Sequence, residues 1–168
     1  MNGQKSPSQL GCEWVEECIE MCVARSVYVE ENGVRATFAN SQRKQVRKIH
    51  YDGCFYTGRG ERADYIVGLT DVIDVIVELK GTDTNLKDAA RQVEKTLDKW
   101  EEHQMRARSI AALIIHGRVE GRKKLPGRAP RTEAVISGLR AEFLKRRRTV
   151  LVIHENGRKR FSFRDFSF

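Results

Sequence analysis

The sequence predicts an α/β fold in which one mixed central sheet is flanked by helices. Short apolar runs typical of strands occur along the whole 168-residue chain, and several segments carry apolar residues at helical spacing. Strands interspersed with helices in this way indicate a sheet with helices packed against it. We expect residues 1–8 to form a flexible tail and residues 9–168 to form a single domain with one core.

The N-terminal part predicts a helix followed by two hairpins. Within residues 9–25, apolar side chains recur at helical spacing and glutamates occupy the positions between them. Those apolar positions are Trp14, Val15, Cys18, Ile19, Cys22 and Val23. An Asn-Gly turn and an Asp-Gly turn then predict hairpins. The expected strand pairs are residues 27–29 with 34–38, and residues 46–51 with 54–56.

The central part predicts a strand pair that is buried on both faces. Tyr65–Leu69 and Val72–Leu79 are nearly continuous runs of Ile, Val and Leu, and Thr70 and Asp71 form the natural turn between them. Continuous apolar runs of this length are typical of strands with both faces covered. We therefore place this pair at the centre of the sheet.

The rest of the chain predicts two helices and further strands. After Gly81, either Asp83 or Thr84 can cap a helix. Its apolar face consists of Leu86, Ala89, Ala90, Val93, Leu97 and Trp100. Residues 109–116 are expected to be a buried strand. Beyond it lie a basic loop at 117–131, a helix capped by Thr132 that ends at 145–148, a strand at 150–154, and an Asn-Gly hairpin into 160–163.

Charge is distributed unevenly along the chain. Residues 1–105 contain 14 Lys/Arg and 18 Asp/Glu, whereas residues 106–168 contain 17 Lys/Arg and 5 Asp/Glu. An acidic half followed by a strongly basic half suits a polyanionic partner such as nucleic acid. The alternative is that the basic residues only solvate loops and helix faces, and charge alone does not choose between them.

The cysteines and the N-terminus point to a reducing compartment. Cys12, Cys18, Cys22 and Cys54 match no paired zinc-binding spacing, so we expect them to be small buried hydrophobic residues. No apolar run approaches the ~20 residues that a membrane-spanning helix needs. The first residues also lack the apolar core of a secretory signal. We expect a cytoplasmic protein without a membrane span.

The strand pair carries charges where it ends. If the turn centres near residue 71, opposite residues have numbers that sum to about 142, and Asp64 lies opposite Glu78. Because side chains alternate along a strand, Glu78 and Lys80 share a face and Leu79 points the other way. Two carboxylates placed together repel each other unless a proton or a cation intervenes. Oxygen ligands suit Mg²⁺ or Mn²⁺, so we predict a metal site at Asp64 and Glu78.

This pattern resembles the PD-(D/E)xK nuclease superfamily, which has the restriction-endonuclease-like fold. The resemblance covers residues 62–97 and assigns metal binding to Asp64 and Glu78, with Lys80 positioning or activating the attacking water. Gln92, on the following helix, is similar to a glutamine that many members place beside the site. Ala63 departs from the family pattern, which has a proline there. The implied core is helix, three strands, helix and strand, with an added helix and a C-terminal hairpin.

An upstream acidic ligand stays open, with five candidates. They are Glu13, Glu16, Glu17, Glu20 and Asp52. The first four fall in the expected N-terminal helix, from which some relatives take such a ligand. Asp52 is first of all part of a turn.

The function expected from these residues is hydrolysis of phosphodiester bonds in nucleic acid by a Mg²⁺-dependent or Mn²⁺-dependent nuclease, with DNA favoured over RNA. The alternative is a catalytically inactive module of the same fold that binds nucleic acid or a protein. Basic side chains of the loop are candidates for phosphate contacts. They are Arg118, Arg122, Lys123, Lys124, Arg128 and Arg131. The resemblance further implies a homodimer.

Overall fold

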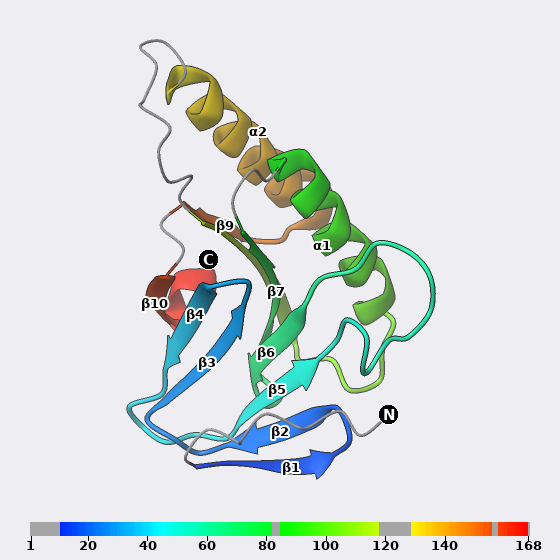
Figure 1. Cartoon of the computed structure of the whole chain (residues 1–168), viewed down its shortest axis with the longest axis vertical. Coiled ribbons are helices and arrows are strands. Elements are labelled where there is room, and N and C mark those ends of the chain that lie inside the picture. The colour runs from blue at the N-terminus through cyan, green and yellow to red at the C-terminus, as the bar shows by residue number, and fades with distance from the viewer. Residues whose placement is uncertain (1–10, 82–84, 118–128, 156–157, 168) are drawn as a thin grey trace.

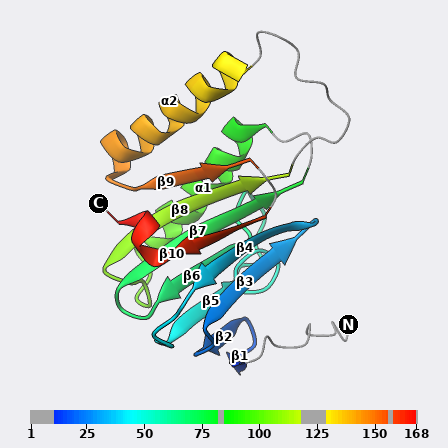
Figure 2. The same ribbon diagram turned by 90° about the vertical axis from the view of Figure 1, so that its left-hand side faces the viewer.

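Two β-sheets and a layer of helices make up the molecule. The computed structural model describes residues 11–81, 85–117, 129–155 and 158–167. These residues form ten strands, two α-helices and one short 3-10 helix. Both helices lie on one face of a seven-stranded sheet, and a three-stranded sheet lies on the opposite face (Figures 1 and 2). No helix among the described residues has the length and apolar character needed to cross a membrane.

The larger sheet is mixed. Its strands in spatial order are β1 (Cys12–Glu16), β2 (Ile19–Cys22), β5 (Val46–His50), β6 (Tyr65–Leu69), β7 (Ile73–Lys80), β8 (Ser109–His116) and β9 (Leu151–His154). Neighbours from β1 to β7 are antiparallel, whereas β7, β8 and β9 are parallel. Parallel neighbours need crossover connections. The helices α1 (Leu86–Trp100) and α2 (Ala129–Arg147) supply them.

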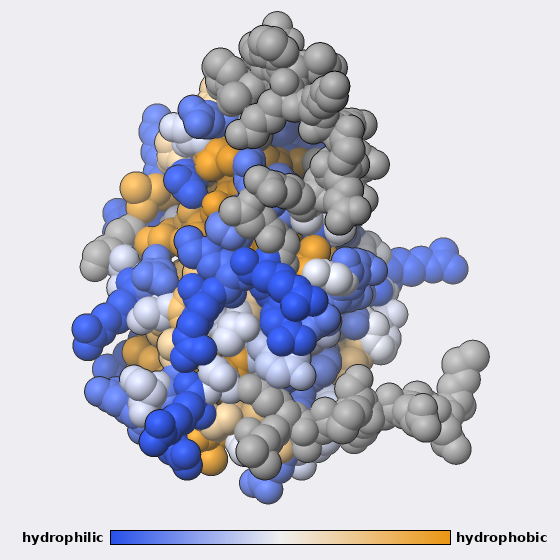
Figure 3. All heavy atoms as spheres, turned by 60° about the vertical axis from the view of Figure 1, so that its left-hand side comes forward, coloured by the Kyte–Doolittle hydropathy of each residue, from blue (hydrophilic) through white to orange (hydrophobic). Residues whose placement is uncertain are grey.

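The smaller sheet joins distant parts of the chain. β3 (Ser26–Glu31) and β4 (Val34–Ala39) form a hairpin, and its turn residues Asn32 and Gly33 have φ values of 53° and 75°. Two positive φ angles in succession are what a two-residue hairpin turn of this hand requires. β10 (Arg158–Ser162) lies parallel to β4 and continues into the 3-10 helix η1 (Phe163–Phe166). Figure 3 looks towards the side of the molecule where these strands lie and shows hydrophilic side chains over much of it.

The core has two layers that meet at the larger sheet. One layer lies between the two sheets and contains Val75, Val77 and Leu79 of β7. The other lies between the larger sheet and the helices and contains Ile76 and Trp100. Because β7 contributes to both layers, its first seven residues are buried. This confirms the expectation that the central strand pair is covered on both faces.

The predicted restriction-endonuclease-like core is wrong, because the described residues are rich in strands and residues 12–22 form strands where the first helix was expected. Residues 12–22 form the hairpin β1–β2, in which Cys12 lies opposite Cys22. The helical spacing of apolar residues there is produced by two short strands joined by a turn, which shifts the alternation between them. The predicted C-terminal hairpin is also wrong, because β10 pairs with β4 of the smaller sheet and not with β9.

The expectation of reduced cysteines is wrong as well. Cys12 is bonded to Cys22 across β1 and β2, and Cys18 at the hairpin turn is bonded to Cys54 after β5. The second bridge ties the first hairpin to the segment between β5 and β6. Residues 54 and 55 form a turn in place of the predicted strand, and Tyr56 forms an isolated bridge with Asp52. A disulfide-anchored turn thus occupies the position of the second expected hairpin.

Other elements agree with the sequence, with shifted ends. The hairpin of β3 and β4, the pair of β6 and β7, and the strand β8 are confirmed. α1 begins one residue after Asn85, whose side chain accepts a hydrogen bond from the Lys87 amide and so caps the helix. Asp83 and Thr84, the caps predicted, lie outside the described residues, as does the expected tail at 1–8. α2 begins at Ala129, before the predicted cap Thr132.

Candidate active site at the end of the central strand pair

The register of β6 and β7 brings Asp64 to Glu78. Tyr65 lies opposite Val77 and Ile66 opposite Ile76, so the numbers of opposite residues sum to 142 as predicted. The pairing continues beyond β6, because the amide of Asp64 donates a hydrogen bond to the carbonyl of Val77 at 3.1 Å. Asp64 therefore lies beside Glu78, near the C-terminal end of β7.

The three predicted charges meet at this point. Lys80 Nζ lies 2.6 Å from Glu78 Oε1, and Asp64 Oδ2 accepts a hydrogen bond of 2.8 Å from the amide of Leu79. Glu78 is only 1% exposed. Its second oxygen, Oε2, is buried and has no hydrogen-bond donor among the residues that the structure describes. A buried carboxylate oxygen without a donor is costly, so this atom is ready for a cation or a proton.

Both carboxyl groups hold protons more tightly than usual. Burial raises the pKa of Asp64 to about 8, with a further contribution from the charge of Glu78. Burial also raises the pKa of Glu78 to about 7, although Lys80 opposes the shift. At neutral pH the pair therefore shares protons, and a divalent cation would displace them. Raised carboxyl pKa values in a cluster are typical of functional sites.

Glu31 is a third acid near the site, and it is not among the residues predicted from the sequence. It ends β3, and its charge adds to the upward shift of the pKa of both Asp64 and Glu78. The turn after it reaches the end of β7, since a methyl group on Gly81 would lie 3.8 Å from Asn32 Cβ. The only sequence signal was the Asn-Gly turn. The packing of the two sheets against each other places this turn near the site, and that packing cannot be predicted from the turn alone.

Gln92 lies on the side of α1 that faces the strand pair. One turn later on the same helix, the Thr96 hydroxyl accepts a hydrogen bond of 2.7 Å from the amide of Ala63, the neighbour of Asp64. Residues four apart share a helix face, so Gln92 lies on this face, one turn nearer the N-terminus of α1. Its Oε1 atom is buried and has no hydrogen-bond partner in the described part of the chain. The amide oxygen is therefore available to a water or a ligand at the site.

His116 is a second residue with no predicted role that lies near the site. It ends β8 directly beside Lys80, and the Gly117 amide donates to the Lys80 carbonyl at 2.9 Å. Its Nε2 atom is buried, forms no hydrogen bond with the residues described, and lies 3.7 Å from Glu155 Oε1. Burial lowers the pKa of its imidazole. It therefore adds a neutral nitrogen at the edge of the site near neutral pH.

The five upstream candidates do not join Asp64 and Glu78. Glu20 is buried on β2 and binds His50 Nε2 at 2.6 Å and Lys48 Nζ at 3.4 Å. Burial would raise its pKa, but His50 and Lys48 outweigh burial and lower it. Asp52 is paired with Arg62. The other three, Glu13, Glu16 and Glu17, are exposed on the first hairpin.

Most of the predicted phosphate-binding residues lie in a segment that the structure does not describe. Arg118, Arg122, Lys123, Lys124 and Arg128 lie outside the described residues. Arg131 falls in the first turn of α2, where only the backbone is described. These contacts stay predictions.

The residues present fit a divalent cation in their chemistry. Asp64 and Glu78 offer hard oxygen ligands, and the buried Oε2 of Glu78 has no donor. Within the described parts of the chain, no three His, Cys, Asp or Glu side chains are already gathered as a complete ligand set. Mg²⁺ commonly keeps several waters and takes one or two protein carboxylates, so a two-carboxylate site suits it.

Comparison with known proteins adds no relative. No family model matches the chain, and neither a curated protein nor a solved structure is significantly similar to it. The chemistry of the site therefore rests on its own geometry.

Proposed function

We propose that this protein is a metal-dependent nuclease that hydrolyses phosphodiester bonds in nucleic acid. Asp64 and Glu78 would hold Mg²⁺ or Mn²⁺, and the observation that carries the proposal is the buried, unpartnered Oε2 of Glu78 beside Asp64. The likeness of Asp64, Glu78 and Lys80 to the PD-(D/E)xK motif supports the same reaction. That likeness now concerns the site alone, because the fold predicted with it is wrong.

Each side chain has a distinct task in such a reaction. A bound Mg²⁺ supplies charge that polarises the phosphate and lowers the pKa of a water. Glu78 keeps Lys80 in place through the contact of 2.6 Å. The Lys80 ammonium, 29% exposed, can hold the attacking water or stabilise negative charge that develops on the phosphate oxygens. Gln92 can accept a hydrogen bond from the same water, since its Oε1 has no other partner.

The distribution of charge supports nucleic acid as the substrate class. The chain has a net charge of +8, and the excess of basic residues lies in its second half. Lys and Arg contacts with phosphates provide affinity that does not depend on sequence. DNA is the first substrate to test, with RNA beside it.

Cleavage assays test the proposal directly. Labelled single-stranded and double-stranded DNA and RNA would be incubated with the protein in EDTA, in Mg²⁺ and in Mn²⁺. We expect cleavage only with metal, and Glu78→Gln and Lys80→Met should slow it at least about 100-fold. Matched controls are Glu102→Gln and Lys95→Met, which change the same charges at exposed positions and should cut like the parent.

Metal affinity separates binding from catalysis. Titration calorimetry with Mn²⁺ should show one site that Asp64→Asn weakens and that releases protons near pH 7, because the ligands must lose them. An absence of cleavage on all four substrates, or cleavage unchanged in Glu78→Gln and Lys80→Met, would overturn the proposed reaction. Mn²⁺ affinity that survives in Asp64→Asn would overturn the assigned ligand.

A further inference from the structure

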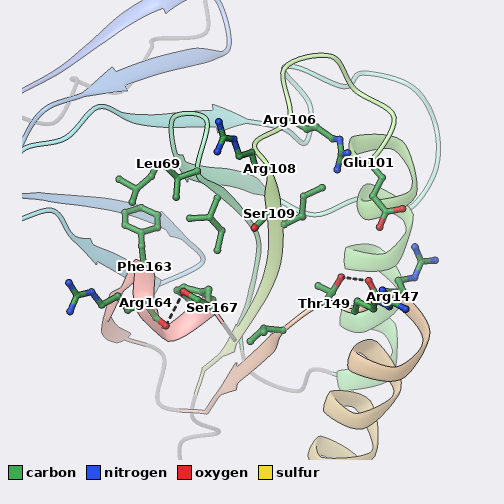
Figure 4. Close-up of a pocket in the computed structure, with 16 residues that line it drawn as sticks. Leu69, Glu101, Arg106, Arg108, Ser109, Arg147, Thr149, Phe163, Arg164 and Ser167 are labelled. Carbon is green, nitrogen blue, oxygen red and sulfur yellow. Dashed lines mark hydrogen bonds between the residues drawn. The ribbon is translucent and has the colours of Figure 1, made fainter.

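A pocket of about 670 Å³ opens at the other end of β7, far from Glu78. It is lined by the end of β6, the starts of β7 and β8, the C-terminal end of α2, and η1 (Figure 4). With a rise of roughly 3.3 Å per residue, the length of β7 separates it from Lys80 by about 20–25 Å. The pocket is therefore distinct from the carboxylate site.

Arginine dominates the charged groups of this pocket. Five arginines line it together with one acid, Glu101. They are Arg106, Arg108, Arg147, Arg148 and Arg164. Only Arg147 is neutralised, since its guanidinium lies 2.6 Å from Asp98 and 3.9 Å from Glu94. The other four form no ion pair with any residue that the structure describes.

The guanidinium groups stand around the opening, not at one point. In Figure 4, Arg106 and Arg108 extend from the segment before β8, while Arg164 extends from η1 on another side. A single compact anion could not reach all of them. Charges spread around a rim suit an anion that is itself extended, with several phosphates along a chain.

The floor between the arginines is apolar. It includes Leu69, Ile73 and Ile110 together with two phenylalanines of η1. Val72, which lines the same pocket, is 56% exposed and adds apolar surface that a ligand can reach. The ligand that fits has apolar faces as well as negative charges. A volume of this size is ordinary for a pocket that encloses a small organic group.

We infer that this pocket receives an unpaired nucleotide of a single-stranded nucleic acid. Taking nucleic acid as the ligand rests on the proposed function. The rim arginines would bind the phosphates, and the apolar floor would contact the base and the sugar. A base inside a duplex is stacked and paired, so it cannot enter a concave pocket without being flipped out. The pocket therefore favours single strands, or the unpaired ends of duplexes, over continuous duplex.

Binding without metal tests the inference apart from catalysis. Fluorescence anisotropy in EDTA would measure the affinity of the full chain for a labelled oligothymidylate and for a duplex of matched length. Arg106→Gln/Arg108→Gln should weaken binding of the single strand about 10-fold, with the slope of log K against log[salt] smaller by about 1.4, which is two phosphate contacts. Val72→Asp, which places a carboxylate at the exposed edge, should weaken it as well.

A matched double variant gives the control. Arg25→Gln/Arg43→Gln removes the same charge from two exposed arginines that do not line the pocket, and binding should change less than about twofold. Equal losses in the two double variants, or duplex binding as tight as single-strand binding, would overturn the inference. If the parent protein neither cleaves nucleic acid nor binds Mn²⁺, that result would count against the proposed reaction only. Conversely, both pocket variants should bind Mn²⁺ like the parent.

Discussion

The two ends of β7 each carry a buried carboxylate on the helix side of the sheet, and the two are partnered very differently. Asp74, near the start of the strand, accepts hydrogen bonds from Trp100 Nε1 at 2.8 Å and from the Ala107 amide at 2.7 Å, and it contacts Arg47 at 3.3 Å. Glu78, near the end, forms an ion pair with Lys80, and no residue that the structure describes lies within hydrogen-bond distance of its Oε2 as a donor. Both residues are 1% exposed.

Asp74 and Glu78 are equally buried on the same strand, but they differ in the hydrogen-bond donors that surround them. The chain supplies donors from α1, β5 and the segment before β8 to Asp74, so that carboxylate needs nothing further. At Glu78 the same fold supplies a second acid, Asp64, in the place of a second donor. Natural proteins rarely leave a buried carboxylate oxygen unpaired, and the proposed metal site rests on this feature of the acid end of β7, the end that carries Glu78.

The largest expected effect is a difference in stability between two identical chemical changes. Asp74→Asn removes the charge that faces Arg47, whose side chain is 13% exposed, and should lower the free energy of unfolding by about 3 kcal/mol or more. Glu78→Gln removes a buried charge that has little compensation and should leave stability unchanged or raise it at pH 8 in EDTA. Urea unfolding of both variants measures the difference. Equal losses would break the comparison.

Two glycines give a steric form of the same contrast. A methyl group on Gly68, opposite Asp74, would overlap Asp74 Oδ1 and lie 2.5 Å from the Ile73 carbonyl oxygen. Gly68→Ala should therefore cost about 1–3 kcal/mol. Gly81→Ala, at the acid end, would place its methyl group no nearer than 3.8 Å to any residue that the structure describes and should cost less than about 0.5 kcal/mol. Thermal unfolding distinguishes them, and a Gly81→Ala loss as large as that of Gly68→Ala would show that the acid end is packed as tightly.

The pH dependence of stability should come from the acid end. The folded-state pKa values of Asp64 and Glu78, about 8 and 7, lie above their ordinary values. The folded protein then binds more protons than the unfolded chain between about pH 4 and pH 8, so stability falls as pH rises through this window. In EDTA we expect Tm to drop by at least about 6 °C between pH 5 and pH 8, because both carboxyl groups lose protons in this range. Asp64→Asn/Glu78→Gln should flatten the profile, and a profile that stays as steep would place the titrating groups elsewhere.

The comparison also explains what the sequence could predict. The register of β6 and β7 was correct because a short turn joins them and their apolar runs leave no alternative pairing. Asp64, Glu78 and Lys80 therefore came together as expected. Glu31 and His116 were missed because β3 and β8 reach the site through the packing of two sheets and through a crossover. Neither the packing of the sheets nor the crossover connection produces a pattern in the neighbouring residues of the sequence.

The errors in the fold have a similar cause. Residues 12–22 have apolar spacing that suits either a helix or two short strands, and the bond between Cys12 and Cys22 belongs to the second arrangement. β10 pairs with β4, which lies more than 100 residues earlier, so the local Asn-Gly signal before it was misleading. The partners of Asp74 were likewise invisible, since they come from three separate elements.

The smallest expected effect is the response of stability to metal, and it bears on the acid end alone. A cation that binds the folded state at ten times its Kd adds about 1.4 kcal/mol, which raises Tm by about 3–5 °C in a chain of this length. Mn²⁺ should give this rise at pH 8, where a larger share of Asp64 and Glu78 is ionised, and a smaller one at pH 6, where protons compete for both carboxylates. Glu78→Gln should abolish the rise. Asp74→Asn should keep it in full from a lower starting Tm, because the Asp74 oxygens already have their donors. A Mn²⁺ response that disappeared in Asp74→Asn and persisted in Glu78→Gln would reverse the roles of the two ends of β7.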